Sequence, residues 1–126
     1  MNYLTAMSDI PEFATATLDI DQHYVPRPLM ENYLKDFKSN GVMAYSLLLN
    51  RLREPFDSIH KGQDDNGNIF VYFPNEELAE ALNCSYSTVV SVKKLLTQKH
   101  LIEEVRQGFG KPNRIYLTDE ILSYYQ

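Results

Sequence analysis

Two successive stripes of apolar residues predict two helices between residues 28 and 55. The first stripe has members at i, i+4, i+5 and i+8 and consists of Leu29, Tyr33, Leu34 and Phe37. Pro28 suits the first turn of this helix, and Asn40-Gly41 is expected to break it. The second stripe consists of Val42, Tyr45, Leu48, Leu49 and Leu52. Pro55 ends the second helix, because proline stops a helical run.

The second half of the chain alternates short helical and short β-rich segments. The predicted elements are, in chain order, a strand at 69–73, a helix at 75–82, a turn at 83–85, a helix at 86–100, and strands at 101–106 and 114–117. Residues 57–68 are polar and predict a loop, with a tight turn at Asn66-Gly67. Asn75 and Ser85 are candidate N-caps of the two helices.

This order of elements predicts a mainly helical α+β fold, a winged helix-turn-helix with a small antiparallel β-sheet. Two short helices joined by a turn form the helix-turn-helix, and the hairpin after them forms the wing. Residues 28–126 are interpreted as this domain. Residues 1–27 show no sustained periodicity and are interpreted as an N-terminal arm, a candidate for dimerisation.

Length and composition narrow the class of protein. A chain of 126 residues corresponds to one domain. The single cysteine, Cys84, excludes an internal disulfide and a multi-thiolate zinc site. No apolar run approaches the roughly 20 residues that span a bilayer, and the N-terminus lacks the pattern of a signal peptide. We therefore expect a cytoplasmic protein that makes no membrane contact.

The charge is unevenly distributed along the chain. The formal net charge is −5, yet residues 86–117 carry six basic and only two acidic side chains. Local field, more than total charge, steers a charged ligand. A basic segment on an acidic body is compatible with a nucleic-acid partner, and chance segregation of surface charge is the alternative.

The helix predicted at 86–100 has one face suited to the major groove of DNA. At about 100° per residue, an inner face is formed by Val89, Val92, Leu95, Leu96 and the stem of Lys99. The opposite face consists of Ser87, Val90, Ser91, Lys94 and Gln98. Small residues permit close approach, lysine reaches phosphate or guanine, and glutamine pairs with adenine. Backbone N–H groups and hydroxyls near Ser85 and Tyr86 suit a phosphate. A surface helix that only packs is the alternative.

The loop QGFGKPNR at 107–114 is better suited to a wing than to a nucleotide cradle. A Walker loop needs four residues between its glycines and a Ser or Thr after the lysine, and neither condition holds here. As a wing, its cations face the DNA backbone or minor groove. A plain hairpin with solubilising charges is the alternative. The candidate DNA-binding residues are Ser85, Tyr86, Ser87, Val90, Ser91, Lys93, Lys94, Gln98, Arg106, Gln107, Lys111, Asn113 and Arg114.

Other classes of function are disfavoured. The histidines His23, His60 and His100 are scattered, and none has a carboxylate or cysteine at ligand spacing, so we expect no enzyme, no metal and no cofactor. A protein-interaction module is a stronger rival, because winged helices also bind proteins. Tyrosines favour such interfaces, and the candidates are Tyr3, Tyr24, Tyr33, Tyr124 and Tyr125.

Four pieces of the chain within residues 24–118 form a distinctive combination, and they are YSLLLNRL, NIFVYF, ELAEALNCSYSTV and RQGFGKPNRIYL. Together they resemble the N-terminal domain of RepA-type plasmid replication initiators of Gram-positive bacteria. The resemblance implies binding of repeated double-stranded DNA sites at a plasmid origin, usually as a homodimer. It also implies a C-terminal part that contacts host replication proteins, so this chain is expected to be an excised N-terminal domain. One departure is His100, where many winged helices have glycine, and we expect a left-handed backbone there. A dimeric transcriptional regulator is the runner-up.

Overall fold

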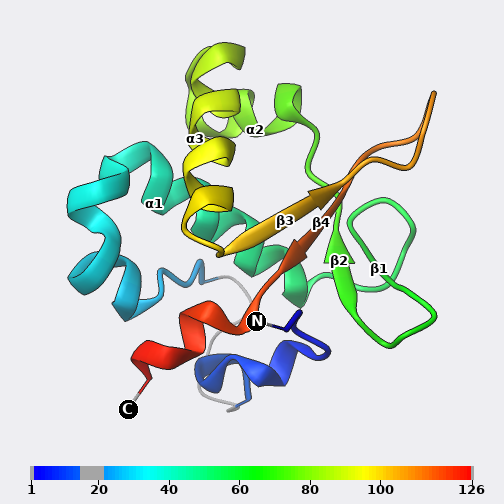
Figure 1. The fold of residues 1–126 in the computed structure, drawn as a ribbon, viewed down its shortest axis with the longest axis horizontal. Coiled ribbons are helices and arrows are strands. Elements are labelled where there is room, and N and C mark those ends of the chain that lie inside the picture. The colour runs from blue at the N-terminus through cyan, green and yellow to red at the C-terminus, as the bar shows by residue number, and fades with distance from the viewer. Residues whose placement is uncertain (1, 15–21, 126) are drawn as a thin grey trace.

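The helices and strands follow the predicted order, with one additional strand (Figure 1). The computed structural model describes residues 2–14 and 22–125. Its helices and strands are α1 (Leu34–Asn50), β1 (Lys61–Gln63), β2 (Ile69–Val71), α2 (Asn75–Leu82), α3 (Tyr86–Gln98), β3 (Ile102–Val105) and β4 (Arg114–Leu117). A π-helical turn, Leu29–Tyr33, precedes α1, and a 3-10 turn, Asp119–Tyr124, follows β4. Together they form the predicted α+β winged helix-turn-helix.

The break between the two predicted N-terminal helices lies at Lys38 and not at Asn40-Gly41. Lys38 has φ 58° and ψ −170°, so the run Leu34–Asn50 is two helical pieces joined at a kink. Gly41 has a different role from the predicted one. A Cβ added to it would lie 2.4 Å from Cβ of Phe37. Glycine is needed there because the buried Phe37 packs directly on the backbone of the second piece.

The sheet is antiparallel, with the strand order β1-β2-β4-β3. The sequence did not predict β1, a polar three-residue strand that pairs with β2. Side chains alternate across β4, so Ile115 and Leu117 face the core while Arg114 and Tyr116 face the other side of the sheet. There Tyr116 stacks on Tyr3, with ring centroids 4.3 Å apart.

The described part of residues 1–27 is built into the core, which differs from the predicted arm. Leu4, Ile10 and Phe13 are all buried in the same cluster as the helices and strands. The backbone N–H of Leu4 donates to the carbonyl oxygen of Leu117 at 2.8 Å, and Leu4 accepts from Ile69 at 3.0 Å. The division at residue 27 therefore does not follow the packing. Residues 15–21 lie outside the described residues.

The tyrosines suggested for an interface make contacts within this chain. The Tyr33 ring stacks on Phe37 at 5.1 Å between centroids and meets Tyr124 edge-on at 5.3 Å. The hydroxyls of Tyr24 and Tyr125 are 2.8 Å apart. All five of these tyrosines are buried or half-buried, so they do not form an exposed aromatic surface. Among the described residues, no helix combines the length and apolar character needed to cross a bilayer.

Candidate nucleic-acid interface

Helix caps and local hydrogen bonds shape the helix-turn-helix, and one of the two caps differs from the prediction. The N-cap of α2 is Pro74 and not Asn75. Asn75 is already helical, and its amide donates to the Tyr86 hydroxyl at 3.3 Å, across the turn. Asn83 ends α2 in the left-handed conformation, with φ 52°. Ser85 caps α3 as predicted, since its hydroxyl accepts from the backbone N–H of Thr88 at 3.1 Å.

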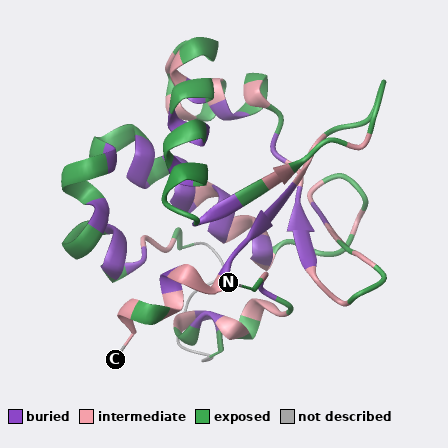
Figure 2. Ribbon diagram, in the orientation of Figure 1, coloured by how far each residue is buried: buried purple, intermediate pink, exposed green. Residues whose placement is uncertain are grey.

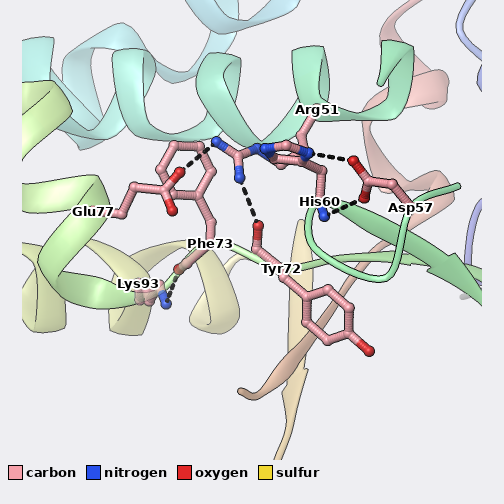
Figure 3. A network of polar contacts seen from close by, with 7 residues as sticks. All are labelled: Arg51, Asp57, His60, Tyr72, Phe73, Glu77 and Lys93. Atoms are coloured by element: carbon pink, nitrogen blue, oxygen red, sulfur yellow. Dashed lines mark hydrogen bonds and ion pairs between the residues drawn. The ribbon is translucent and has the colours of Figure 1, made fainter. Parts of the chain in front are cut away.

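Arg51 at the C-terminal end of α1 fixes the helix-turn-helix to the rest of the domain (Figure 3). Its guanidinium donates to the carbonyl oxygen of Tyr72 at 3.1 Å and to the Glu77 carboxylate at 2.8 Å. It also lies 3.8 Å from the centroid of the Phe73 ring. One side chain therefore joins α1, the residues after β2, and α2. No local pattern in the sequence indicates this role of Arg51, because its partners are 21 and 26 residues away.

The two faces of α3 are largely as predicted. Val89, Val92 and Leu96 are buried against the body of the domain. The exposed residues of the helix and its cap include Ser85, Tyr86, Ser87, Val90, Ser91, Lys94 and Gln98, all of them candidates from the sequence. Two inner positions differ from the prediction. Leu95 is 39% exposed, and Lys99 reaches out to Asp36 at 3.6 Å.

Lys93, a candidate DNA-binding residue from the sequence, is corrected by the structure, because its side chain is buried against the sheet. Its side chain is only 7% exposed and its ammonium lies 3.0 Å from the Glu104 carboxylate on β3. The same ammonium donates to the carbonyl oxygen of Phe73 at 3.3 Å (Figure 3). Lys93 sits on the flank of α3 that faces the sheet, so its charge stabilises the contact between helix and wing. Lys94, the next residue, is exposed and makes no polar contact with any described residue.

The wing, defined as residues 102–117, has a base held by internal contacts. Gln107 donates to the carbonyl oxygen of Pro112 at 2.8 Å and accepts from Arg114 at 3.0 Å. The Arg114 guanidinium also lies 4.4 Å from the Phe70 ring centroid, on the sheet face opposite α3. Asn113 donates to Glu104 at 3.4 Å. These three candidates therefore help to hold the wing in shape, and their contact with DNA stays a prediction.

The free cations of the wing lie near its tip. Arg106 and Lys111 are exposed and have no ion pair or hydrogen-bonded side-chain partner among the described residues. The tip projects away from the body of the domain (Figure 1), and its residues 108–112 are exposed (Figure 2). Phe109 at the apex is fully exposed, with a relative exposed area of 107%. Sequence reasoning missed it, although an aromatic residue between two glycines in a basic loop is a recognisable signal.

The exposed side of α3 has two edges, each bordering a groove. One groove lies between α3 and the wing, and its lining includes Tyr86, Glu104, Lys111 and Asn113. The other groove lies between α3 and the kink of α1, and its lining includes Lys38, Ser39, Ser87, Ser91 and Leu95. Most of the predicted polar face thus lies between the wing and the kink. Lys38 is a second residue that the sequence did not suggest, because the kink had been expected at Asn40-Gly41.

The comparisons with known proteins agree with this architecture. A chain called "N-Terminal domain of DNA binding protein" aligns over 99% of this chain and 92% of its own, with a TM-score of 0.59 and 26% identity. A second, called "Structure of Rep-DNA complex", aligns over 92% of this chain and 89% of its own, with a TM-score of 0.62 and 25% identity.

Sequence comparisons point the same way. The "41 kDa protein" of Lactobacillus helveticus is 35% identical over 79 residues, which are 63% of this chain. The aligned part is only 22% of that protein's length. The family model for the replication initiator protein A (RepA) N-terminus matches residues 23–125, which is most of the chain. The chain therefore belongs to the family of replication initiator protein A N-terminal domains.

Proposed function

We propose that this chain binds repeated double-stranded DNA sites at a plasmid origin and so takes part in starting plasmid replication. In this proposal α3 lies in the major groove, where Val90, Ser91, Lys94 and Gln98 face base edges. The hydroxyls and N–H groups at its N-terminus, around Ser87, face a phosphate. The wing carries Arg106 and Lys111 to the neighbouring backbone.

The observation that carries this proposal is the convergence of α3 and the wing around one groove. Tyr86, the first residue of α3, and Lys111 of the wing line the same groove although they are 25 positions apart. Lys94 and Arg106 remain exposed, without an acidic partner among the described residues. An acidic protein that keeps these cations unpaired is suited to a polyanion.

The names of the similar solved structures support the proposal. One solved chain similar to this one is called a DNA-binding protein domain, and the other comes from a Rep-DNA complex. Membership in the RepA family supports the link to replication. A transcriptional regulator would use the same groove-facing parts, and family membership favours the initiator.

The proposal also covers the oligomeric state of the chain and its lack of catalytic activity. We propose that the chain acts as a homodimer on repeated sites and that it catalyses no reaction. Contact with host replication proteins is assigned to a further domain, in keeping with a relative of which this chain matches 22%. Light scattering at rising concentration, with and without duplex DNA, tests the dimer.

A salt titration of duplex binding tests the main proposal. Wild-type protein is titrated into duplexes carrying the plasmid's origin repeats at a series of salt concentrations. Three free cations, Lys94, Arg106 and Lys111, predict a log–log slope near −3, since each neutralised phosphate adds about 0.9. A slope of zero, or no binding at low salt, contradicts the proposal and favours a protein-interaction module.

Single substitutions separate the two parts of the interface. Lys111→Ala is expected to weaken binding to all duplexes alike and to reduce the slope by about 1, because it removes one phosphate contact. Ser91→Ala is expected to lower the preference for the repeat by on the order of 1–3 kcal/mol if Ser91 contacts a base. Wing variants that change sequence preference while helix variants change all affinities equally would reverse these roles.

A further inference from the structure

Phe109 occupies the apex of the wing with nothing packed against it. Its relative exposed area of 107% exceeds the 68% of Ile59 and the 57% of Phe56, the two next most exposed large apolar residues. Among the described residues it has no aromatic or cation–π partner. An aromatic side chain with no intramolecular contact contributes nothing to the stability of the fold. Its exposure therefore indicates that it contacts a ligand.

The backbone holds this side chain outward. The N–H of Lys111 donates to the carbonyl oxygen of Gly108 at 3.3 Å, which closes a tight turn with Phe109 at its second position. Gly110 at the third position has φ 79°, a value that a type II turn requires. Neither Gly108 nor Gly110 has an atom within 4 Å of an added Cβ, so these glycines serve the turn geometry and not packing. The apex is thus preformed.

The charge around Phe109 identifies the kind of partner. Residues 105–117 contain Arg106, Lys111 and Arg114 and no carboxylate. An apolar residue flanked by free cations matches the minor groove of duplex DNA, where proteins insert Phe, Leu or Ile between base pairs while basic residues bind the phosphates. A hydrophobic pocket on a protein partner would gain from the exposed Arg106 and Lys111 only if acidic groups surrounded it, whereas duplex DNA supplies phosphates along both sides of the minor groove.

We propose that Phe109 is a wedge that enters the minor groove next to the site bound by α3 and partly unstacks one base step. The inference rests on the proposed DNA binding and deepens it. The major and minor grooves alternate along one face of DNA, so the unstacked step lies about half a helical turn, or roughly five base pairs, from the centre of the bases facing α3. Pyrimidine–purine steps such as TA deform most easily and are preferred there.

The test uses duplexes selected from a randomised pool with the wild-type protein. A fluorescent adenine analogue, 2-aminopurine, is placed at successive flanking positions, where its emission rises on unstacking. Wild-type protein is expected to raise the emission at one flanking step and to bend the duplex, as measured by energy transfer between its ends. Replacing a TA step there with a stiff A-tract is expected to weaken wild-type binding.

Three variants isolate the side chain. Phe109→Ala is expected to abolish the rise in emission, reduce the bend and weaken binding on the order of tenfold, with an unchanged salt slope because no phosphate contact is lost. Phe109→Leu, which keeps an apolar wedge, is expected to restore most of the emission. Phe56→Ala makes the same chemical change at another exposed phenylalanine and is expected to behave as wild type. Circular dichroism of each variant checks folding.

The outcomes separate this inference from the proposed function. If wild-type protein selects no duplex, the proposed function fails. If it binds and Phe109→Ala leaves emission, bend and affinity unchanged, the wedge is wrong and DNA binding stands. If the variant loses affinity while the emission and bend stay at wild-type values, Phe109 acts by some other contact and the wedge is equally overturned.

Discussion

Two hairpins of the same sheet end in very different tips. The β1–β2 hairpin is closed by Asp64, whose carboxylate accepts from the backbone N–H groups of Asn66 and Asn68, each at 2.9 Å. The same residue accepts from the Tyr116 hydroxyl at 2.9 Å. The wing tip has no such anchor, and its apex residue Phe109 is fully exposed.

The two hairpins differ in role because their side chains form hydrogen bonds at different places. In the β1–β2 hairpin, Asp64 directs its hydrogen bonds inward, to the hairpin backbone and to β4. In the wing, comparable bonds from Gln107 and Arg114 stop at the base, which leaves Arg106 and Lys111 free beyond it. The first hairpin is a structural element, and the second has the charge and exposure of a binding element.

Reversing the free charges of the wing is expected to have the largest effect. Arg106→Glu combined with Lys111→Glu should lower duplex affinity by on the order of 100-fold at low salt, because two attractions become repulsions. The free energy of unfolding in denaturant should be nearly unchanged, since neither residue has a polar partner among the described residues. Asp65→Lys at the exposed tip of the other hairpin is the control and should leave affinity within about twofold.

Two adjacent lysines of α3, Lys93 and Lys94, allow the effect of a substitution on stability to be separated from its effect on DNA binding. Lys93→Met breaks the buried pair with Glu104 and should lower the free energy of unfolding by about 2 kcal/mol, with little change in the salt slope of DNA binding. Lys94→Met should do the opposite, reducing the salt slope by about 1 and leaving stability nearly unchanged. If Lys93→Met changes the slope and Lys94→Met does not, the assignment of their faces is wrong.

Asp64 provides a pH-dependent test of the first hairpin. Partial burial raises the pKa of its carboxyl, but the hydrogen bonds from Asn68, Tyr116 and Asn66 outweigh burial and leave that pKa below its usual value. A lowered pKa contributes stability above the ordinary Asp value of about 3.9, and this contribution is lost as pH falls through the folded-state pKa.

Asp64→Ala should therefore lower the midpoint temperature of unfolding at neutral pH, and the difference from wild type should shrink in acid. Asp64→Asn keeps an acceptor oxygen and should recover part of the loss. Duplex affinity should be unaffected by either change. A difference that persisted unchanged at low pH would show that the carboxylate charge is unimportant.

The smallest expected effect comes from two glycines, one in the loop of each hairpin. Gly67 and Gly110 have φ values of 85° and 79°, and neither has an atom within 4 Å of an added Cβ. Replacing either with alanine should cost about 1 kcal/mol of unfolding free energy, because a side chain is strained at positive φ. Only Gly110→Ala should also weaken DNA binding. Equal effects of both variants on DNA binding would contradict the proposed functional difference between the two hairpin tips.

The parts of the fold that the sequence predicted are those with local signals. The helix-turn-helix rests on the apolar period of α3 and on the cap at Ser85, and both lie within a few residues of each other. The left-handed His100, with φ 63°, was also predictable because the helix must end there to enter β3. The wing followed from two β-rich runs around a glycine-rich loop.

The parts that the sequence missed depend on distant contacts. β1 is polar and short, and it becomes a strand only by pairing with β2. Leu4 and Ile10 show no period, yet they fill the core beneath residues far along the chain. Lys93 was counted among the candidate DNA-binding residues because its partner Glu104 lies on another element, 11 residues away. A helical wheel does not reveal such partners.

Backbone amide signals, followed by NMR while duplex DNA is added to isotope-labelled protein, show whether α3 and the wing tip bind DNA together. We expect the largest shifts in two separate segments, 85–98 and 106–111, with residues 63–68 nearly unchanged. Shifts concentrated on the β1–β2 hairpin, or confined to α3 without the wing, would contradict the claim that α3 and the wing tip bind DNA together.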